Sequence, residues 1–528
     1  MRRLPRTDKL VDPGFATRQA AGLALLASFA PEPAAITIPR VRAPAAAAAL
    51  PLILTVQAVL SLRLAWSNTA FQDEALYLWA GRAEWAHWLH GAPAPQFQGW
   101  FSGAPVIYPP LGAAADTIGG LAAARGLSLV LMLAATVLLH GVTRRLYTRR
   151  AAGFAAALFA GSAATQFLGA FATYDALALA LLAGATWCAV RARDATRPAA
   201  FAGLLAATAG CMVAANAAKY ASALFDPVVI TVAVLAAWDT RGRRVGAVTA
   251  ATVTGTGAAL LAGGVAAGGR GYWQGILVTT LARAPSNVPA AGILIISAEW
   301  AGVVALLAVF GATATRGTRP ARALAWALAA AVLLAPAEQA RIHVVTSLFK
   351  HVGYGAWFGC AVAGYALTAL ARAVPPVKAR SAAIAATALA LTAAVTGAAV
   401  AQSHFRSWPN STLMLERIYP LLTKGACPCL MMDDKAVRYY LAGRDIDGAI
   451  GRISAPYYFQ YGTATGLPAY RAAIRAGYFG LIEVDPSENA AIYDPLARVL
   501  TQTGTYGEAA SIPSGVAGEP FEIWERNR

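Results

Sequence analysis

The stretch IGGLAAARGLSLVLMLAATVLLHGVTRRLYTRR, residues 118–150, decides the fold class of this chain. Residues 118–140 hold a single charged side chain, Arg125. A run of about 20 apolar residues is enough for a helix to cross a bilayer. Four arginines follow this run, namely Arg144, Arg145, Arg149 and Arg150. An apolar block followed by a basic cluster is typical of a membrane span and its cytoplasmic loop.

The same pattern continues in both directions along the chain. Of the residues, 58% are hydrophobic and 13% are charged, whereas soluble domains carry about 25% charged residues. The apolar blocks predict an all-α polytopic membrane protein with about eleven transmembrane helices. We place the spans near residues 46–66, 118–140, 151–171, 174–192, 200–217, 219–238, 246–268, 291–313, 321–335, 352–372 and 381–402.

The basic residues predict the orientation of these spans. Lys and Arg cluster in alternate short loops, on the side that also carries the N-terminal tail, and that side is expected to be cytoplasmic. The loop clusters begin at Arg144, Arg191, Arg241, Arg316 and Arg372. The net charge of +17 is therefore explained by membrane topology. Because the chain has no zinc finger, aromatic RNA motif or basic helix, we exclude nucleic acid as a partner.

Three regions follow from this topology. Residues 1–45 are predicted to form a cytoplasmic tail, and residues 46–402 a transmembrane domain with a long outer loop at 67–117. In residues 403–528, short apolar runs alternate with amphipathic stretches, which predicts a small extracytoplasmic α/β domain. The apolar stretch at 20–30 resembles a signal-peptide core, but cleavage there would reverse every later helix, against the loop charges.

Two cysteines of the C-terminal region flank a proline. The favoured interpretation of Cys427 and Cys429 is a pair of ordinary thiols, because a disulfide between them would close a very small, strained ring. Such a disulfide remains the alternative. A pair of cysteines alone is too sparse for a zinc site, which usually has four ligands.

Two carboxylates follow the first span, in the sequence Phe71-Gln72-Asp73-Glu74-Ala75-Leu76-Tyr77. Acidic residues are favourable in the first turn of a helix, which is the structural interpretation of this pair. The functional interpretation makes Asp73 a general base at the membrane surface, which accepts a proton from an incoming hydroxyl.

Asp175 lies at the outer junction of the third and fourth spans. A helix N-cap is one explanation for an Asp at this position. The other is a functional role, because an ionisable group beside membrane spans is costly. The sequence Tyr108-Pro109-Pro110-Leu111, just before the second span, predicts a rigid entry turn because proline restricts its own backbone and that of its predecessor.

Several cations are predicted on the outer side, where the charge bias makes them unexpected. Arg and Lys bind phosphate through charge-assisted hydrogen bonds, so these residues are candidates for binding a lipid-linked phosphate. The spacing of the two histidines matches no known metal motif. The candidates are Lys219 with its neighbour Tyr220, Arg341, His343, Lys350 and His351.

Taken together, these residues resemble the GT-C superfamily of glycosyltransferases, in particular the protein O-mannosyltransferase and lipid A aminoarabinose transferase-like branch. The resemblance covers residues 50–240 well and the later spans only in their layout. It rests on Arg63, Asp73 to Tyr77, Tyr108 to Leu111, Ala124-Arg125 and Asp175.

The resemblance implies a polyprenyl-phosphate sugar as donor and an active site at the outer face of a bacterial cytoplasmic membrane. Asp73 falls on the family's catalytic acid, Glu74 on its neighbour that shapes the site, and Asp175 on a second acid. Lys219 matches a phosphate-contacting lysine, and Tyr77, His343 and His351 are further candidates. Because phosphate is already a good leaving group, we expect attack by an acceptor hydroxyl in a single displacement with inversion. A divalent cation remains open.

Other functions are compatible with the same layout. A lipid or glycan transporter or flippase would be expected to show internal repeats and charges at the bilayer midplane. The charges here lie near one surface, which favours an enzyme. A polymerase or ligase of envelope glycans, and a protein that only binds glycan, also remain open. The acceptor, which could be protein, lipid or polysaccharide, is not determined by the sequence.

Overall fold

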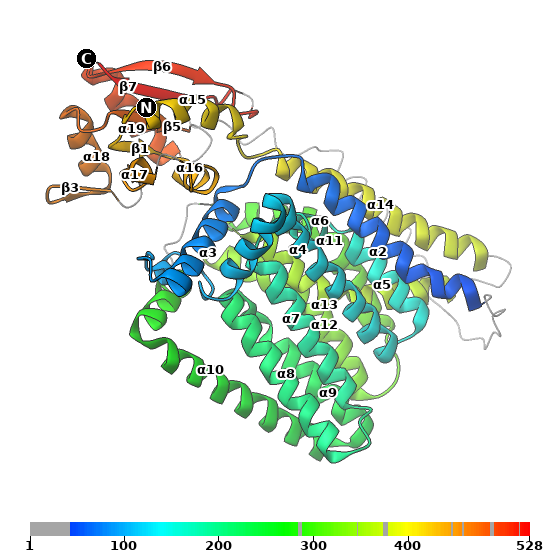
Figure 1. Cartoon of the computed structure of the whole chain (residues 1–528). Coiled ribbons are helices and arrows are strands. Elements are labelled where there is room, and N and C mark those ends of the chain that lie inside the picture. Colours follow the sequence, from blue (N-terminus) through cyan, green and yellow to red (C-terminus); the bar gives the residue numbers. More distant parts are fainter. Residues whose placement is uncertain are drawn as a thin grey trace.

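A helical body and a smaller C-terminal region with a β-sheet make up the protein (Figure 1). The computed structural model describes residues 43–282, 288–345, 347–372, 379–444, 447–456, 459–485, 490–516 and 518–527. Nearly all of the predicted cytoplasmic tail, including the signal-like stretch at 20–30, lies outside the described residues.

Ten helices of the described chain are long and apolar enough to cross a membrane. Every predicted span has a helical counterpart, which confirms the fold class. The ninth, predicted as short, is longer in the structure because it continues to Arg341. The spanning helices are α2 (Ala43–Ala65), α4 (Tyr108–Leu146), α7 (Tyr174–Ala192), α8 (Pro198–Ala218), α9 (Asp226–Arg241) with the 3₁₀ turn η3 (Tyr220–Phe225), α10 (Arg243–Thr279), α11 (Ala290–Ala314), α12 (Arg319–Arg341), α13 (Leu348–Arg372) and α14 (Ala379–Phe405).

The third predicted span is divided into two short helices, α5 (Arg149–Gly161) and α6 (Ala163–Leu168). Ser162 between them is extended, and its side chain accepts a hydrogen bond from the Thr165 amide, so it caps α6. Ser in this position competes with helical hydrogen bonding, which explains why one continuous apolar run forms two helices.

Small residues allow the helices to pack closely around α13, which is buried along most of its length. A Cβ atom added to Gly364 of α13 would lie 2.3 Å from the carbonyl oxygen of Ala151. A Cβ atom on Gly311 of α11 would lie 2.3 Å from that of Val362. Such close backbone approach is how helices associate in lipid, where apolar burial provides little drive.

The long loop at residues 67–117 is largely helical. It contains α3 (Gln72–His90) and the 3₁₀ turn η2 (Phe97–Gly99). The prediction of an entry turn at Tyr108 was wrong, because Tyr108 begins α4 and the two prolines occupy its first turn, where no amide hydrogen is needed. The chain bends later, at Gly119 and Gly120, where Gly120 has φ +64. A left-handed conformation of this kind favours glycine.

A five-stranded sheet with the strand order β2-β1-β5-β7-β6 organises the C-terminal region. The strands β1, β2 and β5 are parallel, and β7 joins β5 and β6 antiparallel. β1 and β5 are wholly buried, which explains the apolar sequence of β1 and the apolar residues on both sides of Glu483 in β5. The strands are β1 (Cys429–Met431), β2 (Ile453–Ser454), β5 (Leu481–Val484), β6 (Tyr506–Ile512) and β7 (Phe521–Arg526), with a separate hairpin of β3 (Gln460–Tyr461) and β4 (Ala464–Thr465).

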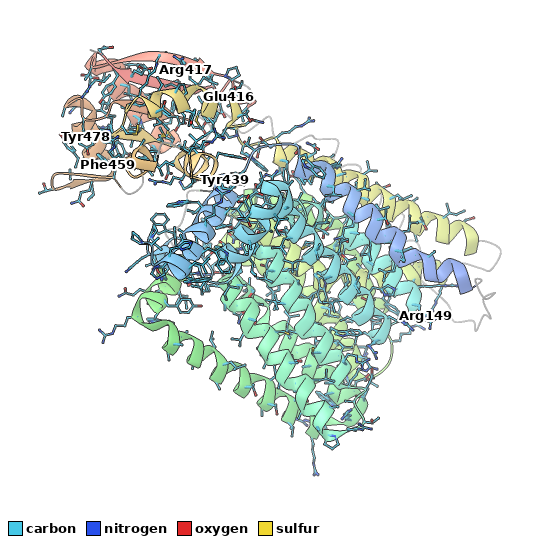
Figure 2. The ribbon with its side chains drawn as sticks, viewed as in Figure 1. Arg149, Glu416, Arg417, Tyr439, Phe459 and Tyr478 are labelled. Carbon is cyan, nitrogen blue, oxygen red and sulfur yellow. A yellow bond between two sulfur atoms is a disulfide. The ribbon has the colours of Figure 1, made fainter. Side chains whose placement is uncertain are left out.

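Helices cover both faces of this sheet, and two apolar clusters form its core. The helices of this region are α15 (Thr412–Thr423), α16 (Asp434–Leu441), α17 (Asp447–Ile450), α18 (Gly466–Arg475) and α19 (Ala490–Thr503). Tyr439 of α16 lies where the C-terminal region approaches the helical body, whereas Arg149 lies at the far end of that body (Figure 2).

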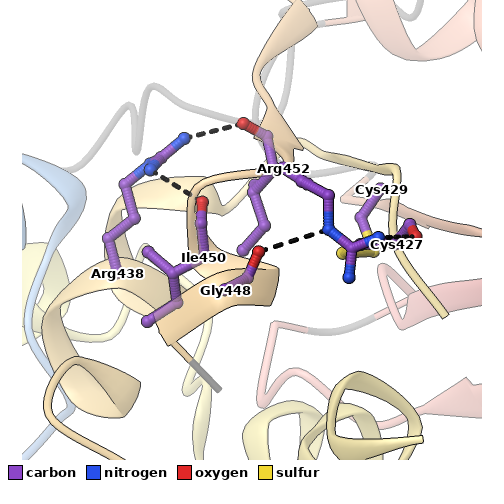
Figure 3. The surroundings of a disulfide bond; sticks show 7 residues. Cys427, Cys429, Arg438, Gly448, Ile450 and Arg452 are labelled. Atoms are coloured by element: carbon purple, nitrogen blue, oxygen red, sulfur yellow. Dashed lines mark hydrogen bonds between the residues drawn. A yellow bond between two sulfur atoms is a disulfide. The ribbon is translucent and has the colours of Figure 1, made fainter. Parts of the chain in front are cut away.

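Cys427 and Cys429 form a disulfide, so the favoured interpretation of two free thiols was wrong (Figure 3). Their Cα atoms lie 4.5 Å apart, within the range that a disulfide spans. The guanidinium of Arg452 donates hydrogen bonds to the carbonyl oxygens of Cys427 and Gly448, which ties the Cys427–Cys429 turn to the segment before β2.

Candidate active site

The first turn of α3 carries the two adjacent acids, a few residues after the end of α2. Phe71 is the N-cap, and the Glu74 carboxylate accepts a hydrogen bond from the Phe71 amide at 3.0 Å. An acid in this position compensates the unpaired amides and the dipole of the helix. Glu74 therefore caps α3, as the structural interpretation of the pair predicts, whereas the Asp73 carboxylate contacts Lys350.

Glu74 forms a buried ion pair with Arg125 of α4. Its oxygens lie 2.9 and 2.6 Å from Nε and Nη2 of Arg125, and neither side chain is exposed. Glu74 also accepts a hydrogen bond from the Ala172 amide at 2.7 Å. Arg125 in turn donates to the carbonyl oxygens of Ala65, Asn68 and Thr69. The pair therefore joins α3, α4 and the segments before α3 and α7 into one rigid unit.

Asp73 points to a different partner, Lys350 at the start of α13. Its Oδ2 lies 2.8 Å from Nζ of Lys350, and its side chain is 31% exposed while that of Lys350 is 6% exposed. Burial by itself raises the pKa of Asp73, and Asp175 adds to this effect. The charges of Lys350 and Lys219 outweigh both, so the pKa of Asp73 is lowered and the carboxylate is ionised.

Asp175 lies fully buried in the first turn of α7. Thr173 is the N-cap of this helix, so the N-cap interpretation of Asp175 was wrong. The Asp175 carboxylate accepts hydrogen bonds from the hydroxyls of Thr173 at 2.8 Å and Tyr354 at 3.1 Å. Nε2 of His351 lies 3.8 Å from the same carboxylate. These contacts orient Asp175 within the cluster.

Lys219 reaches the cluster from the C-terminal end of α8. Its ammonium lies 2.6 Å from Oγ of Ser102 and 3.4 Å from the hydroxyl of Tyr174, and it lies 4.6 Å from the centre of the Tyr174 ring. The Tyr77 hydroxyl donates to that of Tyr174 at 2.8 Å. Burial, followed by the charge of Asp73, raises the pKa of Tyr77, so its hydroxyl keeps its proton.

His351 is oriented from the end of α12. Nε2 of Gln339 lies 3.0 Å from Nδ1 of His351, and both side chains are buried. If the amide donates to Nδ1, the neutral imidazole carries its proton on Nε2, the atom that faces Asp175. Five predicted residues, Asp73, Asp175, Lys219, Lys350 and His351, thus come together at the ends of three helices, α7, α8 and α13, and the first turn of α3.

Three other predicted residues make different contacts. Arg341 is 70% exposed and pairs with Glu338 one turn earlier in α12. Nδ1 of His343 lies 3.0 Å from the carbonyl oxygen of Val288, near the start of α11. The ring of Tyr220 lies 6.0 Å from that of Tyr272 in α10, although its amide donates to the Ser102 carbonyl at 2.8 Å.

Sequence reasoning missed several polar residues of the cluster. Ser102, Tyr174 and Gln339 are uncharged, and nothing in their spacing distinguishes them from other loop and helix-end residues. Arg125 was not assigned to the site from the sequence, although a lone arginine in an apolar span indicates a buried acidic partner.

The described residues contain no group of three or more His, Cys, Asp and Glu side chains arranged to hold a metal ion. Asp73 is paired with Lys350, and Asp175 accepts hydrogen bonds from two hydroxyls. The carboxylates here face cations and donors, so this cluster does not fit a metal ligand set and we assign no step to a metal.

Comparison with solved structures identifies the fold. ArnT from Cupriavidus metallidurans bound to undecaprenyl phosphate superposes with a TM-score of 0.55, at 14% identity, over 92% of this chain and 98% of that chain. The oligosaccharyltransferase of Archaeoglobus fulgidus in complex with Zn and sulfate gives a TM-score of 0.51 at 13% identity, over 86% of this chain and 71% of that one. The same enzyme tethered to an acceptor peptide gives 0.51 at 12% identity.

No protein-family model matches the chain, and no curated protein matches it. The structures described above are GT-C glycosyltransferases. This chain therefore has the GT-C fold, as the resemblance in its sequence implied.

Proposed function

We propose that this chain, which has the GT-C fold, is a membrane glycosyltransferase that moves a sugar from a polyprenyl-phosphate donor to a hydroxyl acceptor. The observation that carries the proposal is the contact between Asp73 and Lys350 beside Lys219 and Asp175. A partly exposed carboxylate next to buried ammonium groups suits a reaction between a hydroxyl and a phosphate ester. The undecaprenyl phosphate bound to ArnT supports a donor of this class.

The proposed reaction is one displacement. Asp73 accepts the proton of the acceptor hydroxyl, and the hydroxyl oxygen forms a bond to the anomeric carbon. The bond between that carbon and the phosphate oxygen breaks, and the electron pair leaves with the phosphate. Lys350 and Lys219 stabilise the added negative charge through charge-assisted hydrogen bonds. Because the oxygen enters opposite to the leaving phosphate, the anomeric configuration is inverted.

The ion pair between Asp73 and Lys350 couples donor binding to base strength. A donor phosphate that accepts a hydrogen bond from Lys350 would compete with Asp73 for the same ammonium. Partial neutralisation of Lys350 would raise the pKa of Asp73 and make its carboxylate a better proton acceptor. Donor binding would therefore activate the base before the acceptor reacts.

Other predicted residues have supporting roles in this proposal. The Asp175 carboxylate, with His351 3.8 Å away, neutralises part of the lysine charge, and Tyr77 orients Tyr174 beside Lys219. Glu74 shapes the site through Arg125. The contacts described above do not support donor-phosphate roles for Arg341 and Tyr220, or a role in the cluster for His343.

The cluster is proposed to lie at the outer face of a bacterial cytoplasmic membrane. The basic loops at the opposite end of the spans favour a cytoplasmic location for that end. The C-terminal region, which we treat as a domain of residues 403–528, contains a disulfide. Disulfides persist in oxidising compartments, which supports an extracytoplasmic location.

The test is transfer of radiolabelled sugar from polyprenyl-phosphate donors to envelope fractions, with membranes that contain wild-type protein or Asp73→Asn. Loss of the general base is expected to lower transfer by about 10²- to 10⁴-fold at equal protein level. Glu84→Gln is the matched control, because Glu84 lies on α3 but is not part of the cluster.

Three other outcomes would contradict parts of the proposal. Equal transfer by wild type and Asp73→Asn would remove Asp73 as base. Absence of transfer by wild type with every donor would favour the alternative, a lipid or glycan transporter or flippase. A product with retained anomeric configuration would exclude the single displacement.

A further inference from the structure

Residues 66–71, which precede Asp73, form several hydrogen bonds with the C-terminal part of the chain, in addition to those that Arg125 donates to Asn68 and Thr69. The Ala70 amide donates a hydrogen bond to the Tyr440 hydroxyl at 2.7 Å. Nε1 of Trp408 donates to the carbonyl oxygen of Thr69 at 3.2 Å. The Asn68 side-chain amide donates to the carbonyl oxygens of Phe405 and Trp408, each at 3.0 Å.

A second set of contacts fixes α16, which carries Tyr440, against α3 and α4. The Tyr439 hydroxyl donates to Asp116 of α4 at 2.6 Å. Arg82 of α3 pairs with the same carboxylate and donates to the carbonyl oxygen of Tyr439 at 2.8 Å. The Arg82 guanidinium also lies 4.7 Å from the centre of the Tyr439 ring. Neighbouring tyrosines of α16 therefore contact the helix that carries Asp73 and the segment before it.

These hydrogen bonds bridge an open region. A cavity of about 310 Å³ lies beside them, and its lining includes Asn68, Thr69, Arg125, Asn410 and Tyr440. Ala70 itself is buried, and the hydrogen bonds that Arg125, Trp408 and Tyr440 form with residues 68–70 hold this segment beside the cavity. Tyr440 is well suited to its part, since burial raises its pKa to about 12 and its hydroxyl remains neutral.

We propose that Tyr440 is a positioning residue for Asp73, and that the C-terminal domain thereby completes the active site. The inference rests on the proposed function, in which Asp73 is the base. Ala70 lies three residues before Asp73, so the backbone of residues 70–72 directs the Asp73 side chain toward Lys350. Without the Tyr440 hydroxyl the Ala70 amide loses its acceptor, and the segment can shift. A displacement of about 1 Å at a reacting group can lower the rate by about 10²-fold.

The experiment compares wild type, Tyr440→Phe and the control Tyr493→Phe in purified full-length protein. Tyr440→Phe keeps the ring but removes the acceptor of the Ala70 amide. The control removes the hydroxyl that donates to Glu522 at 2.7 Å, within the C-terminal region and away from α3. Transfer kinetics give kcat and KM for the polyprenyl-phosphate sugar. Amide hydrogen exchange of peptides covering residues 66–71 gives the mobility of the segment without reference to activity.

The expected result is a fall in kcat of about ten- to a hundredfold in Tyr440→Phe, with an unchanged KM for the donor. Exchange in residues 66–71 becomes faster in this variant, and the control behaves as wild type in both measurements. If Tyr440→Phe does not fold, Trp408→Phe, which removes the hydrogen bond to Thr69, is expected to show the same two effects.

The outcomes separate this inference from the proposed function. Unchanged exchange in residues 66–71, or an unchanged kcat, in a folded Tyr440→Phe protein would overturn the positioning role. Equal loss of kcat in the control would also overturn it, because the effect would then be general. Absence of transfer by wild type would overturn the proposed function, and with it any role of Tyr440 in catalysis, whatever the exchange result.

Discussion

Removing one partner of the Glu74–Arg125 pair is expected to destabilise the protein strongly. Glu74→Gln leaves the Arg125 charge fully buried without a counterion, and Arg125→Met leaves the Glu74 charge in the same state. Breaking a buried ion pair in this way costs about 3–5 kcal/mol. The Arg125 variant also leaves the carbonyl oxygens of Ala65, Asn68 and Thr69 without their donor.

The double variant Glu74→Gln/Arg125→Met removes both charges at once. The Phe71 and Ala172 amides donate to different oxygens of Glu74, and glutamine keeps one oxygen that can still accept from one of them, so part of the network is kept. We therefore expect the double variant to be more stable than the sum of the two single effects predicts, by about 1–3 kcal/mol.

The assay is equilibrium unfolding of purified protein in mixed micelles with increasing SDS, followed by tryptophan fluorescence. Single variants that change the free energy of unfolding by less than about 0.5 kcal/mol, as surface substitutions do, would refute the reasoning. So would strictly additive effects in the double variant, because additivity would show that the two side chains do not interact.

Two further predictions concern pH. The pKa of Asp73 lies below its ordinary value of 3.8 because Lys350 outweighs burial, so the stabilisation from this pair is present above that value and is lost as the pH falls through the lowered pKa. In Lys350→Met burial dominates, and the acid limb of the transfer rate is expected to move to higher pH; a limb that stays in place would contradict this. Burial, with Asp433 next, raises the pKa of Glu483 well above 4.5. The contribution of Glu483 to the free energy of unfolding is therefore full below pH 4.5 and is lost as the pH rises through the raised pKa. Glu483→Gln should remove this decrease in the free energy of unfolding above pH 4.5, and an unchanged pH dependence would exclude it.

The membrane part of the fold could be predicted because lipid imposes a simple rule on sequence. Each span needs an apolar run, and every predicted run has a helical counterpart. The division at Ser162 was not predicted, because hydropathy records length and not backbone hydrogen bonding. The bend at Gly119 and Gly120 was missed for the same reason.

The sequence predicts at which end of the spans a candidate residue lies. It does not predict which face of its helix the residue occupies. Arg341 and Lys350 both follow or begin spans at the same end, so the sequence treats them alike. Only the rotation of each helix determines that Lys350 is buried beside Asp73 while Arg341 is exposed beside Glu338. Ser102 and Gln339 carry no charge and follow no periodic pattern, so the sequence could not identify them as neighbours of Lys219 and His351.

The bond between Ala70 and Tyr440 has a consequence for biosynthesis, since 370 residues separate its partners in the chain. At about 5–20 residues per second, a ribosome needs roughly 20 to 70 s to make the intervening polypeptide. During that interval α3 has already been synthesised, but the tyrosine that holds the segment before it does not yet exist. A nascent or truncated chain can thus insert its first helices without completing the arrangement around Asp73, and this arrangement can form only after Tyr440 has been synthesised.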